Sequence, residues 1–473
     1  MPRKRLRDVI FILPGFGGSV LEAENHVVWD LSVPALWNAL RHRSETLELL
    51  TLPEREAGAI SATHVIRTPH LIPGLAKSKG YKELTDAIRA RFEVIGDANA
   101  GEPSNLVEFP YDWRRDIRVS AAELAGQVER RMRAWREQTG ESEARAILIG
   151  HSMGGLVARY YLEALEGFTD CRALFTLGTP HRGAIGALEF LTNGYKRAFL
   201  DLSAALRSFP AAYQLLPIYP VVESDGQLLR AAECEQLPNL DREPVQEGLR
   251  FHRCLEAQAA ANEDNEDYRR HAPVITPIVG VGQATMQSAS LAGGQLTVAE
   301  TLPDGIDAIL ADGDGTVPRV SATPVSESDS QRASFVVERH SALQCEPHVL
   351  GDVLERIAQM QVRGLARIRL APVLEEPVRQ RGVSLALEDL YREGEQPVLG
   401  VTPLGVSGAA APRVTLTAVQ ARVAQAAVEA RSQDEGWRIT LPELPCGDYE
   451  IEVALTYDAG TVHARDIFTV LGE

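Results

Sequence analysis

The stretch that most constrains the fold is an apolar run that leads into a glycine-flanked serine and then continues as a helical pattern. Residues 146–149 read as a buried strand, Gly150 to Gly154 spell GHSMG, and the residues from Gly155 onward have helical spacing. A strand followed at once by Gly-x-Ser-x-Gly and a helix predicts a nucleophile elbow, which raises a serine hydroxyl above the edge of a sheet. We therefore predict that Ser152 is a nucleophile.

An elbow of this kind needs backbone N–H groups to bind the oxyanion that forms when the serine attacks a carbonyl. One donor should be the residue after the nucleophile, Met153, at the N-terminus of the helix. The other should come from a loop after an early strand, and PGFGGS follows the apolar run at residues 9–13. We predict that Phe16 supplies this second N–H, with Gly17 as the alternative, although a plain glycine-rich turn also fits these residues.

A serine hydroxyl needs a general base, and the base needs an acid that orients it. In folds with this elbow the chain order is serine, then acid, then histidine. After Ser152, the turn DGDG at residues 312–315 follows one expected strand, and the next, SFVVE, ends just before His340. We predict His340 as the base; the alternative, His348, falls within a helical pattern. His151 points elsewhere in such an elbow, so we expect it to pack or to support the site.

The segment ADGDGTVP, residues 311–318, has two aspartates and must be tested as a calcium loop. A loop of the EF-hand kind, counted from Asp312, needs glycine at position 6 and glutamate at position 12. This chain has Val317 and Thr323 there, so we expect no metal. The segment GVGQAT, residues 280–285, lacks the third glycine and the acidic residue of a dinucleotide fingerprint, so we expect no cofactor. From spacing alone, either aspartate of the turn could be the acid.

Short apolar runs alternate with helical patterns up to about residue 360, which predicts a parallel sheet with helices on both faces. The expected strands are residues 9–13, 106–109, 146–149, 173–177, 274–279 and 334–337. The expected helices include residues 121–138, 155–166 and 347–361.

Two segments fit neither pattern, at about residues 22–80 and 184–272, and we expect them to be insertions into the fold. The first part of the second segment has apolar residues spaced for one face of a helix. Between the insertions, PYDWRRD at residues 110–116 ends a strand with charged residues at close spacing. We expect Asp112 and Arg114 to form an ion pair that fixes this loop, rather than to contact a substrate.

Toward the C-terminus the chain changes to short β-rich runs separated by glycine, proline and aspartate, which predicts a small antiparallel sandwich. Within it, Leu444, Gly447 and Tyr449 form the LxxGxY pattern of a tyrosine corner, which is typical of immunoglobulin-like sandwiches. We therefore divide the chain into a catalytic domain, residues 1–364, and a β-sandwich domain, residues 365–473.

The composition excludes several classes of function. A net charge of -17 over 473 residues argues against binding to nucleic acid or to an anionic membrane surface, because both favour clustered lysine and arginine. The five cysteines are scattered and form no CxxC pair, which predicts free thiols rather than a zinc site or a disulfide framework. The N-terminal apolar run is too short for a signal peptide, and no apolar run is long enough to span a bilayer. We therefore expect a cytoplasmic protein.

Six segments together resemble the lecithin:cholesterol acyltransferase family, which includes lysosomal phospholipase A2 and phospholipid:diacylglycerol acyltransferases. They are, in order, PGFGGSVLEA, PYDWR, GHSMGG, LGTPHRG, SFPAAYQLLP and GDGTVP, and the likeness covers about residues 8–360. The resemblance implies an α/β-hydrolase fold with cap and lid insertions, a lipid-ester substrate and a serine acyl-enzyme. Its motifs imply the nucleophile Ser152, the acid Asp314, the base His340 and the oxyanion donors Phe16 and Met153.

The chain departs from the secreted members of this family, because residues 22–80 lack the cysteines of the lid disulfide and the C-terminal sandwich lies outside the family pattern. We predict a serine lipase, phospholipase or acyltransferase that acts on lipid acyl esters. Its expected contacts are a transient one with a membrane surface through the lid and one with a protein through the sandwich. The alternatives are a non-lipid esterase or amidase on the same fold, and a catalytically inert interaction scaffold.

Overall fold

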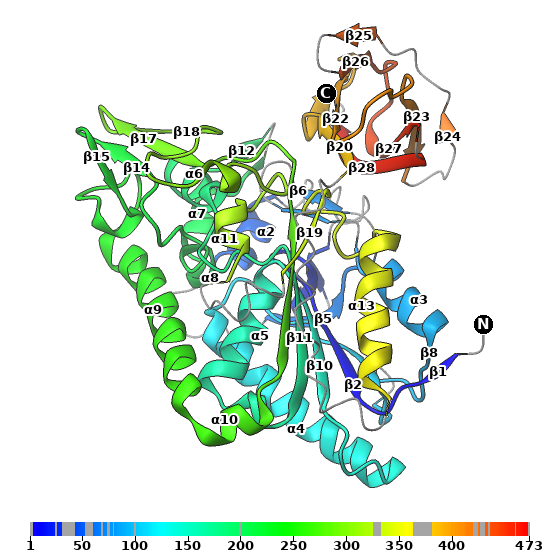
Figure 1. Ribbon diagram of the computed structural model, residues 1–473. Helices are drawn as coiled ribbons and strands as arrows, with labels where there is room; N and C mark the ends of the chain where they lie inside the picture. Colours follow the sequence, from blue (N-terminus) through cyan, green and yellow to red (C-terminus); the bar gives the residue numbers. More distant parts are fainter. Residues whose placement is uncertain are drawn as a thin grey trace.

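The computed structural model contains a parallel sheet flanked by helices, a cap over that unit, and a β-sandwich (Figure 1). The predicted boundary at residue 364 lies outside the residues that the structure describes, and the first insertion is described only in part. The described residues are 3–23, 26–30, 43–52, 60–67, 70–72, 76–78, 80–98, 101–197, 200–324, 333–362, 381–419, 424–425, 431–433, 436–458 and 460–471.

Six parallel strands, all within the described residues, form the central sheet in the order β19-β16-β11-β10-β2-β9. Each matches a predicted strand to within two residues at either end. The chain leaves β2 toward β9 on one side and returns to β10 on the other, so the strand order reverses between β2 and β10. Ligands of open α/β sheets bind at such a switch point, beyond the carboxyl ends of the strands. The strands are β2 (Val9–Leu13), β9 (Leu106–Glu108), β10 (Ala146–His151), β11 (Cys171–Leu177), β16 (Val274–Gly280) and β19 (Ser334–Val336).

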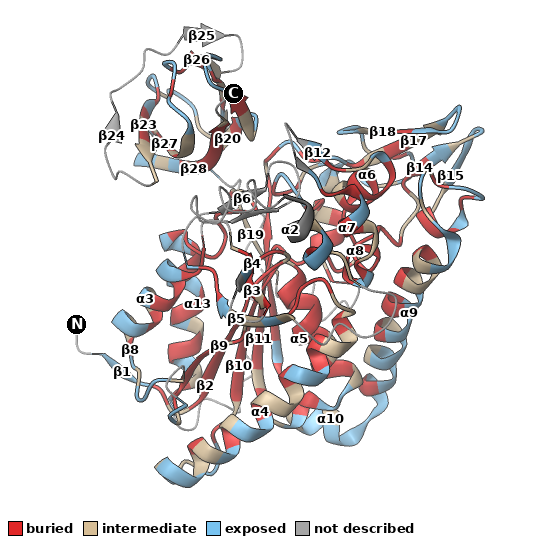
Figure 2. Cartoon of the chain, turned by 180° about the vertical axis from the view of Figure 1, so that it is seen from behind, coloured by how far each residue is buried: buried red, intermediate tan, exposed pale blue. Residues whose placement is uncertain are grey.

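Helices cover both faces of this sheet, as the uninterrupted apolar strands predict. In β2, Phe11 packs into the core on the side of α4 and α5, whereas Ile10 and Ile12 pack into the core on the side of α3 and α13. Successive side chains point to opposite faces, so every residue of β2 is buried. Figure 2 shows these buried strands between helices whose outer faces are exposed. The helices are α3 (Lys82–Arg91), α4 (Ile117–Thr139), α5 (Met153–Ala164) and α13 (Pro347–Met360).

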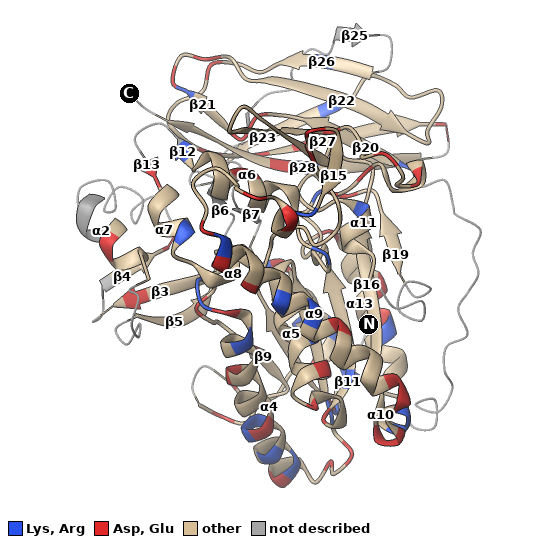
Figure 3. Ribbon diagram, turned by 90° about the vertical axis from the view of Figure 1, so that its left-hand side faces the viewer, with Lys and Arg blue, Asp and Glu red and all other residues tan. Residues whose placement is uncertain are grey.

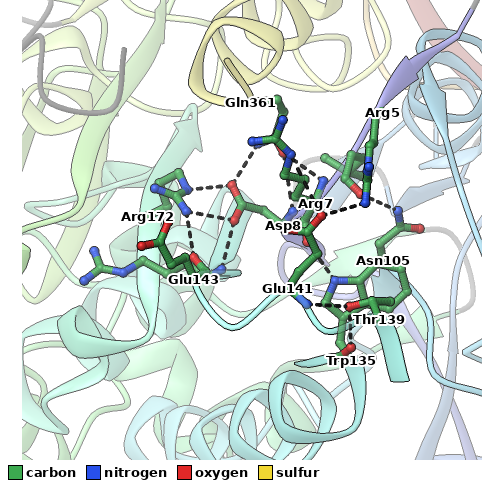
Figure 4. A network of polar contacts seen from close by, with 12 residues as sticks. Arg5, Arg7, Asp8, Asn105, Trp135, Thr139, Glu141, Glu143, Arg172 and Gln361 are labelled. Carbon is green, nitrogen blue, oxygen red and sulfur yellow. Dashed lines mark hydrogen bonds and ion pairs between the residues drawn. The ribbon is translucent and has the colours of Figure 1, made fainter. Parts of the chain in front are cut away.

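Buried Asp8 anchors the amino end of the sheet (Figure 4). Its carboxylate accepts hydrogen bonds from the guanidinium of Arg172 at 2.6 and 3.0 Å and from the side chain of Gln361 at 2.8 Å. It also accepts from the backbone N–H of Arg145 at 2.9 Å. These partners come from β11, from the end of α13 and from the residue before β10. The network therefore joins distant segments at the end of the strands opposite to Ser152.

The insertion between β11 and β16 forms most of the cap. The cap contains a four-stranded sheet with the order β15-β14-β17-β18, in which β14 pairs in parallel with β17. Since β17 and β18 follow β16, the cap extends beyond residue 272, where the predicted insertion ended. Its elements are α6 (Ile185–Asn193), β12 (Lys196–Arg197), β13 (Leu200–Asp201), α7 (Ser203–Arg207), α8 (Pro210–Tyr213), β14 (Val222–Ser224), β15 (Gln227–Leu229), α9 (Arg242–Asp264), α10 (Glu266–His271), β17 (Ser288–Ala292) and β18 (Gln295–Ala299).

The described part of the first insertion is tied to the core by the predicted ion pair. Arg114, which is 1% exposed, donates to the carboxylate of Asp112 at 2.8 and 2.7 Å. It also donates to the backbone carbonyls of Leu49 and Leu50 at 3.1 and 3.0 Å, so the pair holds α2 in place. Other elements outside the central sheet and the cap are β1 (Lys4–Arg5), β3 (Ser19–Ala23), β4 (His26–Trp29), α2 (Arg43–Leu50), β5 (Ile60–Val65), β6 (His70–Ile72), β7 (Ala76–Ser78), β8 (Phe92–Glu93) and α11 (Arg319–Ala322).

The C-terminal unit is a β-sandwich of two sheets, ordered β20-β22-β26-β25 and β21-β28-β27-β23-β24. Its pairs are antiparallel except that β21 lies parallel to β28, which the sequence did not predict. The hydroxyl of Tyr449 donates to the carbonyl of Pro445 at 2.8 Å, which is the bond expected of a tyrosine corner. The strands are β20 (Gly382–Ala386), β21 (Leu390–Arg392), β22 (Val398–Leu404), β23 (Arg413–Ala418), β24 (Ala424–Gln425), β25 (Arg431–Gln433), β26 (Gly436–Thr440), β27 (Gly447–Tyr457) and β28 (Gly460–Leu471).

The surface and the thiols agree with the composition. Charges of both signs are interspersed along the outer helices α4, α9 and α10 (Figure 3), so the negative net charge is not concentrated there. All five cysteines lie in described segments and are free thiols, as predicted. Among the described residues, no helix has both the length and the apolar composition that crossing a bilayer would require.

Candidate active site

Ser152 lies in the sharp turn between β10 and α5, where the elbow was predicted. Its backbone has φ 51° and ψ −125°, which is a costly conformation for any residue other than glycine. The turn is held by a hydrogen bond from the Ser152 N–H to the carbonyl of Leu177, 2.8 Å away at the end of β11. The serine side chain is partly exposed at the carboxyl edge of the sheet.

Glycines flank this turn because nothing larger fits. A Cβ on Gly150 would lie 2.7 Å from the Cα of Gly155, which begins the next turn of chain. A Cβ on Gly154 would lie 2.5 Å from the carbonyl oxygens of Leu13 and Pro14. Helix α5 therefore packs directly on the end of β2, and this close packing aims the serine.

The loop after β2 lies directly beside the serine. A Cβ on Gly15 would be 2.9 Å from the Cβ of Ser152, so this approach requires glycine. Phe16 follows Gly15, and Met153 is the first residue of α5. The first N–H groups of a helix, such as that of Met153, have no carbonyl partner within the helix, which makes them suitable donors to an oxyanion. The segments that carry the predicted donors Phe16 and Met153, with Gly17 as the alternative, thus meet around the serine.

Asp314 and His340 come together where the chain leaves β16 and β19. Nδ1 of His340 donates to Oδ2 of Asp314 at 2.7 Å, and the two residues are 7% and 1% exposed. Because a carboxylate only accepts, the Nδ1 proton points to Asp314 and leaves the Nε2 lone pair free to accept a proton. Oδ1 of Asp314 accepts from the N–H groups of Thr316 and Val317 at 3.0 and 2.7 Å, so the turn itself orients the carboxylate.

The two aspartates of ADGDGTVP have different surroundings. Oδ2 of Asp312 accepts from the N–H of Gly282 at 3.0 Å, and its carbonyl accepts from the N–H of Arg319 at 2.8 Å. Burial raises the pKa of the Asp312 carboxyl. Asp312 thus fastens the turn to the loop after β16, and Asp314 is the one that contacts a histidine. That histidine is His340, whereas His348 is exposed in the first turn of α13.

A chain of hydrogen bonds that the sequence analysis missed joins the loop after β2 to His340. The hydroxyl of Tyr81 accepts from the N–H of Gly15 at 2.8 Å and lies 2.8 Å from Nδ1 of His151. Nε2 of His151 lies 3.0 Å from the carbonyl oxygen of His340. Since a carbonyl only accepts, Nε2 of His151 carries the proton and Nδ1 accepts from Tyr81. His151 therefore supports the site, and no sequence pattern marked Tyr81.

Aromatic side chains from four separate segments gather beside the oxyanion loop. The ring centroid of Phe16 lies 4.7 Å from that of Trp113, which in turn lies 4.7 Å from that of Trp29. Phe209 of the cap completes the group, with its centroid 5.7 Å from that of Trp113. We call these four residues the aromatic cluster. It joins the cap to the loop that carries the predicted oxyanion donor.

Near the base, three potential metal ligands lie close together. One atom each from Glu338, Glu346 and His348 falls within 4.8 Å of the others. The guanidinium of Arg465, from β28 of the sandwich, lies 4.0 Å from Oε1 of Glu346 and already brings positive charge to this group. Glu346 therefore takes part in an ion pair between the hydrolase unit and the sandwich.

This strand order, with a serine in an elbow after β10 and an Asp–His pair beyond β16 and β19, defines an α/β-hydrolase fold. Residues 90–244 match the model of the lecithin:cholesterol acyltransferase family. The matched segment contains PYDWR, GHSMGG, LGTPHRG and SFPAAYQLLP, so the match confirms the family resemblance over that range. Together the fold and the match support a hydrolase of the lipase or acyltransferase type.

Several chains of solved structures match this one, among them the following two. A Bacillus licheniformis lipase in its mature form has 11% identity and a TM-score of 0.34, with 76% of this chain and 94% of that chain covered. A peroxisomal α/β-hydrolase from Saccharomyces cerevisiae has 10% identity and a TM-score of 0.27, with 79% of this chain and 82% of that chain covered. No curated protein sequence matches this chain. The fold assignment rests on the strand order of the chain itself.

Proposed function

We propose that the protein is a serine hydrolase that cleaves or transfers the acyl group of a lipid ester through an acyl-enzyme. The observation that carries this proposal is the 2.7 Å hydrogen bond between Asp314 and His340 on the same edge of the sheet as the strained elbow of Ser152. An acid, a histidine and a serine in this chain order are the groups that acyl transfer needs.

In the proposed mechanism, Nε2 of His340 takes the proton of the Ser152 hydroxyl as its oxygen attacks the acyl carbonyl. The N–H groups of Met153 and Phe16 bind the oxyanion of the tetrahedral intermediate. Asp314 orients the imidazole and stabilises its charged form. His340 then returns the proton to the leaving alcohol, and it later activates the water or alcohol that releases the acyl group.

Two features support a lipid substrate over a small soluble ester. The aromatic cluster packs beside the oxyanion loop, and its partly exposed member Phe16 offers apolar surface where the acyl chain of a bound ester would begin. Helix α6 of the cap is largely apolar and buried, and the family match covers this part of the chain. Each buried methylene contributes about 0.8 kcal/mol, so an apolar site that buries the whole chain would favour longer acyl chains by roughly fourfold per added carbon. The cytoplasmic location and the protein partner expected from the sequence stay predictions.

The test combines covalent labelling with a substrate series. We expect a fluorophosphonate probe to label the native protein and not Ser152→Ala, and we expect kcat/KM for p-nitrophenyl esters to rise from acetyl toward long-chain esters. Phospholipid vesicles with and without an alcohol acceptor then separate hydrolysis from transfer. If the native protein does not react with the probe, the proposal that it is a serine hydrolase is wrong. A preference for acetyl esters would favour the non-lipid esterase.

A further inference from the structure

The β-sandwich lies over the carboxyl end of the central sheet, next to the loops that carry Asp314 and His340 (Figures 1 and 3). We propose that the sandwich positions this acid–base pair, and that it acts through Gln283 and Arg339. The two residues belong to the hydrolase domain, and each touches the sandwich on one side and the catalytic loops on the other. As a statement about catalysis, the inference rests on the proposed function.

Gln283 connects the sandwich to the acid. Its side chain is 2% exposed and bridges two backbone groups of β20: Nε2 donates to the carbonyl of Val383 at 3.2 Å, and Oε1 accepts from the N–H of Leu385 at 3.3 Å. Its own N–H donates to the carbonyl of Gly313 at 3.0 Å, immediately before Asp314. One residue therefore holds the edge of the sandwich with its side chain and the acid turn with its backbone.

This contact uses backbone N–H and C=O groups on the outer side of β20, an edge strand of the sandwich. β20 is an edge strand that pairs only with β22 among the described strands, and Val383 lies opposite Pro403, which has no N–H. Val383 and Leu385 therefore point their backbone groups outward, where an edge strand needs partners. The carboxamide of Gln283 supplies one donor and one acceptor at the spacing of a neighbouring strand.

Arg339 connects the sandwich to the base. Its Nη1 donates to the carbonyl of Leu385 at 3.1 Å and to the carboxylate of Asp466 in β28. Asp466 is fully buried, with 0% exposure, so its pairing with Arg339 is strongly coupled to the docking of the sandwich. Arg339 directly precedes His340, whose N–H donates to the carbonyl of Asp314 at 2.8 Å. Movement of Arg339 would therefore move the base.

Close packing between the domains reinforces these bonds. A Cβ on Gly282, the residue before Gln283, would lie 2.6 Å from Cδ1 of Leu404 in β22. A Cβ on Gly382 would lie 2.3 Å from Cγ1 of Val337, just after β19. The sandwich thus packs against the hydrolase domain at two places, one beside Gln283 and one just after β19.

The base needs this support because the sheet holds it weakly. β19 is three residues long, half-exposed and paired with β16 through three residue pairs at the edge of the sheet. A misplacement of about 1 Å at a catalytic group costs roughly 100-fold in rate. The bonds through Gln283 and Arg339 are suited to prevent such a displacement.

The test uses the full-length protein and two changes that remove each connection without leaving a buried charge. Gln283→Leu removes the bridge to β20 and keeps the bond from its N–H to Gly313. The pair Arg339→Gln with Asp466→Asn neutralises the buried ion pair. We expect each to lower kcat by about 10- to 100-fold with little change in KM. The single change Arg339→Lys keeps a cation beside Asp466. Its kcat should therefore lie between that of the native protein and that of the double variant.

Proton NMR supplies a readout that does not depend on turnover. The proton between His340 and Asp314 should resonate far downfield and be assigned by its loss in Asp314→Asn. We expect it to shift or broaden in both interface variants. Asp458→Asn is the matched control, because it makes the same change of charge at an exposed position just after β27, in the same sheet as Asp466. It should leave the resonance and kcat unchanged.

The outcomes separate the two proposals. If the resonance and kcat of the interface variants equal those of Asp458→Asn, the sandwich does not position the pair and the inference is wrong. If the native protein does not react with a fluorophosphonate, the proposed function fails. The NMR comparison then still decides whether the sandwich aligns Asp314 with His340.

Discussion

The two halves of the proposed site are held in different ways. Ser152 and the oxyanion loop follow β10 and β2, which lie inside the sheet with a strand on either side. Asp314 and His340 follow β16 and β19 near one edge, where β19 has β16 alone as a neighbour among the described strands. The first half is fixed by glycine packing and backbone bonds within one domain, and the second also depends on contacts with another domain. The centre of a sheet can orient a side chain by itself, whereas its edge needs help from outside.

The largest expected effect separates the two aspartates at the edge. Asp314→Asn should lower kcat by about 10⁴-fold, because the imidazole loses the acceptor that sets its tautomer. Asp312→Asn should cost about tenfold or less, since that carboxylate holds a turn rather than the base. Both variants should be checked for folding by circular dichroism. Equal losses in kcat would mean that the acid is misassigned.

A pair of glycine substitutions compares the two halves directly. In Gly154→Ala the new Cβ meets two carbonyl oxygens of the rigid sheet at 2.5 Å, so we expect the free energy of unfolding to fall by about 3 kcal/mol. In Gly280→Ala it meets the Cβ of Asp314 at 2.5 Å and the carbonyl oxygen of Glu338 at 2.8 Å, both in segments at the edge of the sheet, so the acid should move and kcat should fall with a smaller loss of stability. Thermal melts and kcat measured on both variants test this. The comparison fails if Gly280→Ala is as destabilised as Gly154→Ala.

A buried histidine in the cap gives the stability of the protein a signature in pH. His252 in α9 donates to the carbonyl of Gln214 at 2.7 Å, and burial lowers its pKa to about 4. The unfolded chain, with a histidine pKa near 6.5, binds more protons between those values. Stability is therefore complete above about pH 6.5 and falls as the pH drops toward 4, by about 2 kcal/mol at pH 5.

Urea unfolding at pH 7 and pH 5 measures this loss. His252→Gln keeps a donor for the Gln214 carbonyl and removes the titration, so its stability should change less between the two values. His463→Gln, at an exposed position of β28, is the matched control and should behave like the native protein. If His252→Gln loses as much stability as the control on acidification, another group is responsible.

The smallest expected effect concerns the hydrogen-bonded chain that joins the two halves. Tyr81→Phe leaves the N–H of Gly15 without its acceptor and His151 without its donor, so we expect kcat to fall by about tenfold. Because Tyr81 and His151 act in series, adding His151→Asn to Tyr81→Phe should cost less than the sum of the two single changes. A double-mutant cycle on kcat measures this. Additive losses would show that the two residues act separately.

The sequence predicted the fold well where its signals are local. The strands of the central sheet alternate with helices along the chain, and each is an apolar run with clear ends. The GHSMG turn has a strand on one side and a helix on the other, so its geometry follows from its immediate neighbours. The motif GDGTVP and the position of His340 after a strand likewise led to two side chains that the structure brings together.

Other parts of the site had no local signal. Tyr81 follows a glycine in an unremarkable helical start, and nothing near it in sequence indicates contact with His151, which is 70 residues away. Gln283 reads as a loop residue in GVGQAT, and its bridge to β20 crosses about 100 residues. The parallel pairing of β14 with β17 in the cap is also non-local. Patterns of periodicity and turn chemistry do not reveal such pairings.

By itself, the sequence determined the parallel sheet, the elbow of Ser152, the candidates Asp314 and His340 in the order that a triad needs, and the change to a β-rich C-terminal domain. These follow from residue periodicity and from the backbone limits of glycine, which act over a few neighbouring residues. The tertiary structure alone decided that the sandwich docks on the acid and base loops and that Tyr81 joins the oxyanion loop to His151. Those contacts depend on which buried polar groups meet once the chain has packed, and each must find a partner wherever the fold places it.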